Sequence, residues 1–164
     1  MKVYNRKSLR LKGYDYSRAG KYFITTCTYK RQNLFGKIKN KKMILNHAGK
    51  IIKRWYLELE NKYNTTCHEY IIMPDHVHFI IEINADMSLC THIKLGQIVG
   101  WFKTFTTNEI IKEVKSKKLK PFYKKVWQRD YYESIIRTER GFERVVKYIK
   151  NNPLKYIDAK ENKK

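Results

Sequence analysis

The chain has 164 residues, a length typical of one domain that buries its own hydrophobic core. Its 36 Lys and Arg against 15 Asp and Glu give a formal net charge of +21, far beyond what solubility requires, so we expect a polyanionic partner. The sequence shows no long uncharged apolar run and no signal peptide at its start, which favours a cytoplasmic protein that binds nucleic acid over one that binds a membrane.

The domain organisation is predicted to be simple. No internal repeat, Pro/Gly-rich linker or break in composition divides the sequence, so we expect one domain over residues 1–164 with flexible ends at about 1–15 and 157–164. The three cysteines, Cys27, Cys67 and Cys90, lack the close pair spacing of a disulfide framework or a zinc knuckle. The 13 tyrosines, interleaved with lysines, suit base stacking and phosphate contact, or reflect only an AT-rich genome.

The first part of the chain predicts a strand, a lysine-rich segment and a helix. Residues 21–30 combine aromatic and β-branched side chains and predict the first strand. Residues 34–46 predict a short strand or a loop that carries four lysines. Residues 46–63 predict a helix with Asn46 as N-cap, because apolar side chains recur there on one face, at Ile51, Ile52, Trp55 and Leu59.

Two histidines one residue apart dominate the middle of the chain, in the strand-like run YIIMPDHVHFIIEI (residues 70–83). Its alternate residues 77, 79, 81 and 83 are apolar, so His76 and His78 share the opposite face of the strand. Two neutral imidazoles side by side are a metal-ligand pair. An isolated pair of this kind is more often a pair of surface or core histidines, and that alternative stays open here. Pro74 marks a bend or an edge.

The last part of the chain predicts two helices with a strand between them. Residues 92–113 have helical periodicity, and residues 112–125 carry seven lysines that form either a solvated helix end and loop or a basic arm for a nucleic-acid strand. Residues 126–137 read as a strand that enters a helix capped by Thr138. Pro153 ends this helix, because proline disfavours helical geometry in the residue before it.

The last predicted helix carries a second pair of candidate functional residues, a tyrosine and an asparagine. Its apolar stripe consists of Phe142, Val145, Val146 and Ile149, and Tyr148 and Asn152 lie four residues apart on the flank of this stripe. The element order β, α, β, α, β, α predicts an α+β sandwich, ferredoxin-like or RRM-like, with an antiparallel sheet and helices packed on one face. Periodicity alone leaves the strand order open.

The chain resembles the single-tyrosine HUH transposases, and within them the REP-associated tyrosine transposases of bacterial chromosomes. The likeness runs through GYDYSRAGKYFITTCTYKRQNLFG, LNHAGKIIKRWY, YIIMPDHVHFIIEI and VWQRDYYESIIRTERGFERVVKYIKNNPLKY. The resemblance implies that His76 and His78 bind a divalent cation, that Asn152 completes the metal site, and that Tyr148 is the nucleophile. With two imidazoles, one amide and open water positions, we expect Mg²⁺ or Mn²⁺.

The resemblance also implies the activity: a transposase or endonuclease that cleaves and rejoins single-stranded DNA carrying hairpins, through a covalent 5′-phosphotyrosine intermediate, at the bacterial nucleoid. The expected partner is therefore single-stranded DNA with a hairpin, and no membrane. Relatives act as dimers or as monomers, so a homodimer stays open.

Two other functions are compatible with the residues. One is a nucleic-acid-binding module of the same fold without catalysis. The other is a metal-dependent phosphoesterase that uses water, although only Asp75 and Glu82 supply carboxylates near the histidines. The pair Tyr131-Tyr132 and Tyr156 are weaker nucleophile candidates than Tyr148. No comparable motif supports a functional role for the remaining histidines, which are His47, His68 and His92.

Overall fold

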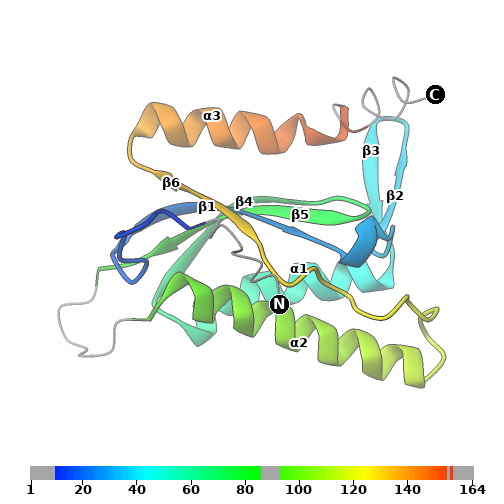
Figure 1. Cartoon of the computed structure of the whole chain (residues 1–164). Helices are drawn as coiled ribbons and strands as arrows, with labels where there is room; N and C mark the ends of the chain where they lie inside the picture. Colours follow the sequence, from blue (N-terminus) through cyan, green and yellow to red (C-terminus); the bar gives the residue numbers. More distant parts are fainter. Residues whose placement is uncertain (1–9, 86–92, 155, 157–164) are drawn as a thin grey trace, which may run out of the picture.

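The structure is a computed structural model in which residues 10–85, 93–154 and 156 are described. Its centre is an antiparallel sheet of four strands in the order β4-β5-β1-β6 (Figure 1). The strands are β1 (Gly20–Cys27), β4 (Thr65–Ile72), β5 (His76–Ile83) and β6 (Tyr132–Ile136). The two central strands pair along their whole length, with Cys27 opposite His76 and Gly20 opposite Ile83. The strand β5, which carries His76 and His78, is therefore paired with β4 on one side and with β1 on the other.

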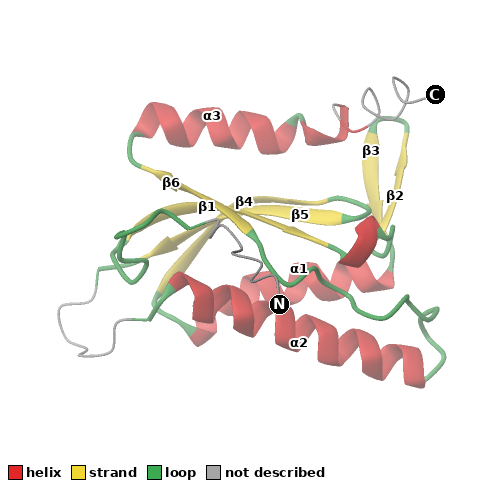
Figure 2. Cartoon of the chain, in the orientation of Figure 1, coloured by secondary structure: helices red, strands yellow, loops and turns green. Residues whose placement is uncertain are grey.

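Three helices cover this sheet, and they lie on both of its faces. The helices α1 (His47–Lys62) and α2 (Leu95–Lys115) lie side by side on one face, and α3 (Glu139–Lys150) lies across the other (Figure 2). The predicted α+β class with an antiparallel sheet is confirmed, with the difference that the helices do not all pack on one face. The second face carries the buried Ile80 of β5 opposite Phe23 of β1, and burying such apolar side chains requires a cover.

The hydrophobic core lies between the sheet and the pair α1 and α2. From β5 it contains the side chains that the alternating pattern predicted, among them Val77 and Phe79, both essentially inaccessible to solvent. Ile52 of α1 and Phe102 of α2 cover them from the helical layer. The histidines of β5 are thereby directed to the face that α3 covers.

The lysine-rich segment predicted as a short strand or a loop is a separate hairpin of β2 (Gly36–Lys39) and β3 (Lys42–Leu45). Asn40 and Lys41 form its two-residue turn with φ angles of 49° and 61°, the left-handed conformation that such turns require. A Cβ atom on Gly36 would lie 2.1 Å from the carbonyl oxygen of Ile44, so the close approach of the two strands requires glycine there.

Both predicted helix caps are present. The side chain of Asn46 accepts a hydrogen bond from the Gly49 amide at 2.9 Å, and that of Thr138 accepts one from the Gly141 amide at 3.1 Å. Pro74 lies between β4 and β5, outside the ladder, as predicted. The last helix ends at Lys150, earlier than predicted, and helical backbone resumes over residues 152–154.

Parts of several predictions lie outside the described residues. They are residues 1–9 and 157–164 of the expected flexible ends, Cys90 and His92. Cys27 and Cys67 are free thiols. Over the ranges that the structure describes, no helix combines the length and the hydrophobicity needed to cross a bilayer.

Candidate active site

His76 and His78 lie next to each other on the face of the sheet that α3 covers. Their ring centroids are 4.7 Å apart, and the two residues are only 6% and 5% exposed. Val77, between them, points into the core on the opposite face. The alternation of β5 alone thus brings two buried imidazoles side by side.

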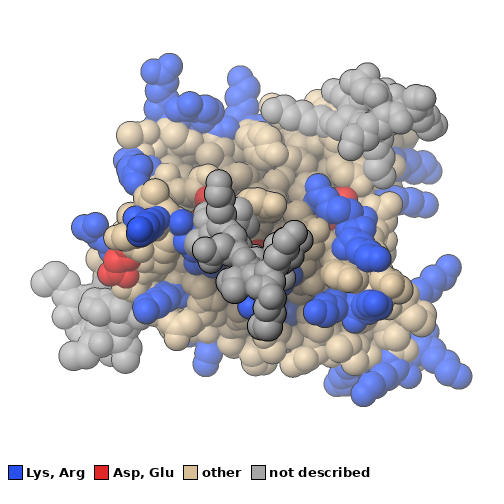
Figure 3. Space-filling view, in the orientation of Figure 1, with Lys and Arg blue, Asp and Glu red and all other residues tan. Residues whose placement is uncertain are grey.

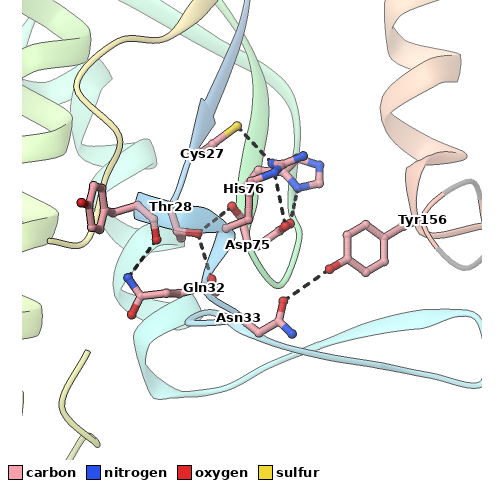
Figure 4. Close-up of polar contacts among 9 residues, drawn as sticks. Cys27, Thr28, Gln32, Asn33, Asp75, His76 and Tyr156 are labelled. Atoms are coloured by element: carbon pink, nitrogen blue, oxygen red, sulfur yellow. Dashed lines mark hydrogen bonds and ion pairs between the residues drawn. The ribbon is translucent and has the colours of Figure 1, made fainter. Parts of the chain in front are cut away.

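Each imidazole is oriented by a hydrogen bond at Nδ1. His76 Nδ1 lies 2.6 Å from the carboxylate oxygen Oδ1 of Asp75 (Figure 4), and His78 Nδ1 lies 2.7 Å from the hydroxyl oxygen of Thr25 on β1. Arg31 forms an ion pair with Asp75 at 3.5 Å. With Nδ1 engaged in this way, Nε2 of each ring is the nitrogen that can bind a cation, and a carboxylate behind a ligating histidine is the usual support for such a bond.

Burial keeps the imidazole of His78 suited to metal binding near neutral pH. Burial, and then the neighbouring His76 and Arg31, lower the pKa of His78 to about 3, so its imidazole is neutral. Burial alone would raise the pKa of Asp75, but the hydrogen bond and charge of His76, together with Arg31, bring it below its ordinary value. An ionised carboxylate close to the neutral imidazole of His78 favours a bound cation.

Tyr148 reaches the histidine pair from α3. Its ring lies edge-on against that of His78, with centroids 5.3 Å apart, and edge-on against Phe23 at 5.9 Å. Phe23 in turn stacks on His78 at 5.4 Å, so one side of the imidazole is covered by an aromatic ring. Tyr148 is 37% exposed. A solvent-accessible phenol thus lies beside the buried imidazoles, from an element distant in sequence.

Asn152 and Tyr156 follow the end of α3. Asn152 is 5% exposed and lies past Asn151, the residue that caps the end of α3. The ring of Tyr156 lies 6.0 Å from that of His76, and its hydroxyl is 3.3 Å from Asn33 Oδ1 (Figure 4). Tyr148 and Tyr156 thus contact the two histidines, and Asn152 is four residues from each of them.

The side chains present suit a divalent cation of the Mg²⁺ or Mn²⁺ type better than structural zinc. Structural zinc sites use four Cys or His ligands, and no cluster of three or more His, Cys, Asp or Glu side chains that could hold a metal occurs in the described part of the chain. Two imidazoles, with the carboxamide that the resemblance assigns to the site, leave positions for the water and phosphate oxygens that Mg²⁺ and Mn²⁺ bind.

The other candidates of the sequence analysis have partners or surroundings of their own. His47 pairs with Glu113 at 2.8 Å, and His68 pairs with Glu82 at 2.7 Å. Tyr131 is buried, whereas Tyr132 is exposed on β6. Their partners and burial account for both histidines and for Tyr131 without a role in catalysis.

Sequence reasoning missed three residues that shape the site. Thr25 and Phe23 alternate on the strand opposite His78, and Arg31 follows that strand in the turn η1 (Tyr29–Arg31). Alternation along β1 placed Phe23 and Thr25 on one face, but only the pairing of β1 with β5 shows that it is the histidine face. Arg31 has no local signal, because its contact with Asp75 crosses the fold.

Comparisons with known proteins give matches over most of the chain. A sequence model of the family described as "Transposase IS200 like" matches residues 17–152. A Haemophilus influenzae protein of unnamed function is 34% identical over 163 residues, which cover 93% of this chain and 90% of the relative. A second Haemophilus influenzae protein, provisionally named as a REP-associated tyrosine transposase, is 24% identical over 153 residues, 87% of this chain and 74% of its own.

Two solved structures share the fold. A REP-associated tyrosine transposase bound to a REP hairpin superimposes with a TM-score of 0.60 at 18% identity, over 95% of this chain and 74% of the other. A protein from Deinococcus radiodurans R1, provisionally described as a transposase, superimposes with a TM-score of 0.53 at 15% identity, over 87% of this chain and 95% of the other. At these identities the likeness concerns the fold alone.

Proposed function

The chain belongs to the IS200-like transposase family, and we propose that it cleaves and rejoins single-stranded DNA carrying hairpins through a covalent phosphotyrosine intermediate. The observation that supports this most directly is the meeting of Tyr148 with the histidine pair, with ring centroids of Tyr148 and His78 5.3 Å apart. A nucleophile and two metal ligands are the minimum set for this chemistry. The setting is the nucleoid of a bacterial cell.

Tyr148 is the attacking group in this proposal. Its phenolic oxygen forms a bond to the phosphorus of the scissile phosphodiester, and the bond from phosphorus to the 3′-oxygen breaks. The phenol proton is released and the departing 3′-oxygen is protonated, which leaves a free 3′-hydroxyl and a 5′-phosphate joined to Tyr148. A second 3′-hydroxyl can attack this phosphotyrosine and release the phenol, which rejoins strands without a nucleotide cofactor.

His76 and His78, with Asn152, are the residues that would hold the divalent cation. When bound, the cation offsets the negative charge that develops on the non-bridging phosphate oxygens. Asp75 and Thr25 fix the two imidazoles through Nδ1, so the protein orients its ligands before DNA arrives. Phe23 covers one side of His78 and limits water there.

The proposed substrate is supported by charge and by a structural relative. A net charge of +21 favours binding of a nucleic acid through contacts with its phosphates. A protein of the same fold has been solved with a REP hairpin bound. We propose that this chain likewise binds a hairpin and acts on the single strand that flanks it.

A single assay tests the proposal. The protein is incubated with a labelled single strand that flanks a hairpin, with Mn²⁺ or with a chelator, and the products are separated under denaturing conditions. We expect a protein–DNA adduct that forms only with the metal. Cleavage without an adduct would instead indicate a hydrolase that uses water, and binding without cleavage a non-catalytic module. Either result would refute the proposed function.

A further inference from the structure

Two tyrosines and two lysines form an exposed surface on the turn η1 and the segment that follows α2. The rings of Tyr29 and Tyr123 are nearly parallel, 20° apart, with centroids at 6.2 Å. The ammonium groups of Lys30 and Lys124 lie 5.1 Å and 5.4 Å from the centroid of the Tyr123 ring. Tyr123 is 50% exposed. We call these four side chains the Tyr123 surface.

The backbone of this surface is fixed by one side chain, that of Gln32. Its Oε1 accepts a hydrogen bond from the Tyr123 amide at 2.6 Å, and its Nε2 donates to the Tyr123 carbonyl at 3.0 Å. Lys30 and Lys124 have φ angles of 53° and 57°, in the left-handed region that residues with a Cβ seldom adopt. Strained conformations persist where the surrounding structure holds them, and they concentrate at ligand sites.

The Tyr123 surface is joined to the histidine pair by a short chain of contacts. Tyr29 and Lys30 belong to η1, whose third residue is Arg31. Arg31 pairs with Asp75 at 3.5 Å, and Asp75 bonds His76 at 2.6 Å. Figure 4 shows the hydroxyl of Thr28, which precedes η1, bonded to the carbonyl of Asp75 and to that of Gln32, which follows η1. The Tyr123 surface is thus connected to the histidine pair through η1, Arg31 and Asp75.

A basic groove begins at the same place. Its volume is about 400 Å³, and it lies between α2 and residues 122–129, so it includes the neighbours of Tyr123 on both sides. Among the described residues, four cations line it, Lys103, Lys124, Lys125 and Arg129, and no carboxylate does. Figure 3 shows Lys and Arg side chains along this edge of the molecule. Lys103 shapes the groove wall, because its ammonium group donates to the Gln128 carbonyl at 2.7 Å.

We propose that the Tyr123 surface binds the single-stranded DNA next to the cleavage site: one base stacks on Tyr123, and the phosphates beside it contact Lys30, Lys124 and the groove. A ring flanked by cations matches a base flanked by phosphates. Single-stranded DNA fits better than duplex, because bases inside a duplex already stack on one another and offer no free face. This inference rests on the proposed function and deepens it, since it assigns a part of the substrate to a second surface.

The first test measures binding without chemistry. Fluorescence anisotropy with a labelled oligothymidylate that lacks a hairpin, in a chelator, reports the affinity of the full chain. We expect Tyr123→Leu to weaken binding roughly tenfold, within the range for base–aromatic stacking, and Tyr123→Trp to retain it. Phe105→Ala is the matched control, because it removes a 38% exposed ring from α2. It should bind as the wild type does.

Charge and position give a second test. Lys30→Gln and Lys124→Gln should each reduce the slope of log affinity against log salt by about 0.7, whereas Lys53→Gln, an exposed lysine of α1, should leave it unchanged. In the wild-type protein, a strand that carries 5-iododeoxyuridine should crosslink to Tyr123 on irradiation.

The outcomes separate this inference from the proposed function. An affinity of Tyr123→Leu within twofold of the wild type, an equal loss in Phe105→Ala, or crosslinks confined to other residues would overturn the Tyr123 surface. The metal-dependent adduct would be unaffected by such a result. If Tyr123 binds the strand but no adduct forms with Mn²⁺, the binding surface stands and the proposed transesterification fails.

Discussion

The ring of Tyr148 on α3 meets that of His78 on β5 edge-on, at a centroid distance of 5.3 Å and an interplanar angle of 71°. Tyr148 belongs to the surface helix α3, and His78 belongs to a central strand of the sheet, so the contact joins two adjacent layers. Edge-to-face contact of this kind is favourable, so it holds the phenol beside the imidazole before any substrate binds. The arrangement is therefore built into the folded chain.

This contact gives a prediction for Tyr148→Phe. The ring and its contact with His78 are retained, but the nucleophilic oxygen is lost, so the covalent adduct should disappear while the affinity for DNA stays within about twofold. Denaturing electrophoresis of the adduct and anisotropy of the same strand measure the two quantities. Tyr156→Phe is the control, because its ring also lies beside the pair, at 6.0 Å from His76. It should still form the adduct.

An adduct that survives Tyr148→Phe and is lost in Tyr156→Phe would contradict this prediction. That result would assign the nucleophile to Tyr156.

The face on which the histidines lie was predictable from the sequence, and so were the helix caps. The alternation of residues 77, 79, 81 and 83 placed both imidazoles opposite the core. The caps Asn46 and Thr138 were predictable because capping depends on a side chain and an amide only three residues away. These features are local, and local patterns carry them.

The partners of the histidines were not predictable, since they depend on strand pairing. Thr25 reaches His78 because β1 pairs with β5, and no pattern within residues 21–30 fixes that neighbour. The placement of α3 on the second face follows from Phe23 and Ile80, whose exposure could not be judged without the sheet order. Tyr156 follows Pro153, which predicts that the helix has ended, yet the backbone returns to a helical conformation and brings Tyr156 to His76.

Asp75→Asn should weaken metal binding without removing a ligand. The carboxylate holds His76 Nδ1 at 2.6 Å, and removing its charge makes the imidazole a poorer ligand. We expect a loss of about 10- to 100-fold in Mn²⁺ affinity, measured by calorimetry without DNA. Glu69→Gln is the control, because Glu69 pairs with Lys150 on the surface. Equal Mn²⁺ affinity in Asp75→Asn and the wild type would exclude a supporting role for this carboxylate.

The buried imidazole of His78 predicts how stability changes with pH. An unfolded histidine has a pKa near 6.5, whereas burial lowers the pKa of His78 to about 3 in the folded chain. Between these values the unfolded state binds a proton that the folded state does not, so the free energy of unfolding rises with pH. The contribution of His78 to the free energy of unfolding is complete above pH 6.5 and is lost as the pH falls towards 3. It amounts to at most about 5 kcal/mol.

Urea denaturation at several pH values between 4 and 7 measures this effect. The free energy of unfolding should fall less steeply with acid in His78→Gln than in the wild type, because glutamine does not titrate. His47→Gln is the matched control, since it removes a histidine whose side chain is 49% exposed. Parallel curves for wild type and His78→Gln would show that His78 does not carry the dependence.

The last prediction concerns the buried carboxylate of Glu133, whose charge is paired by Arg10. Glu133 of β6 has a side chain only 1% exposed, so its carboxylate is buried. Arg10 pairs with it at 3.5 Å and lies over the ring of Tyr131, 4.2 Å from its centroid. Arg10→Met would leave this carboxylate buried without its cation, so we expect the free energy of unfolding to fall by about 2–3 kcal/mol.

A second substitution separates the lost charge from the lost packing. Glu133→Gln removes the uncompensated charge, so the double variant Arg10→Met/Glu133→Gln should be more stable than Arg10→Met alone, by roughly 1–2 kcal/mol. Urea midpoints with unchanged slopes measure both values. If the double variant is no more stable than Arg10→Met, the contribution of Arg10 is its packing on Tyr131 and not its charge. The adduct assay on Arg10→Met at low temperature should still give product, because Arg10 lies on the core side of the sheet with Tyr131, away from the histidine face.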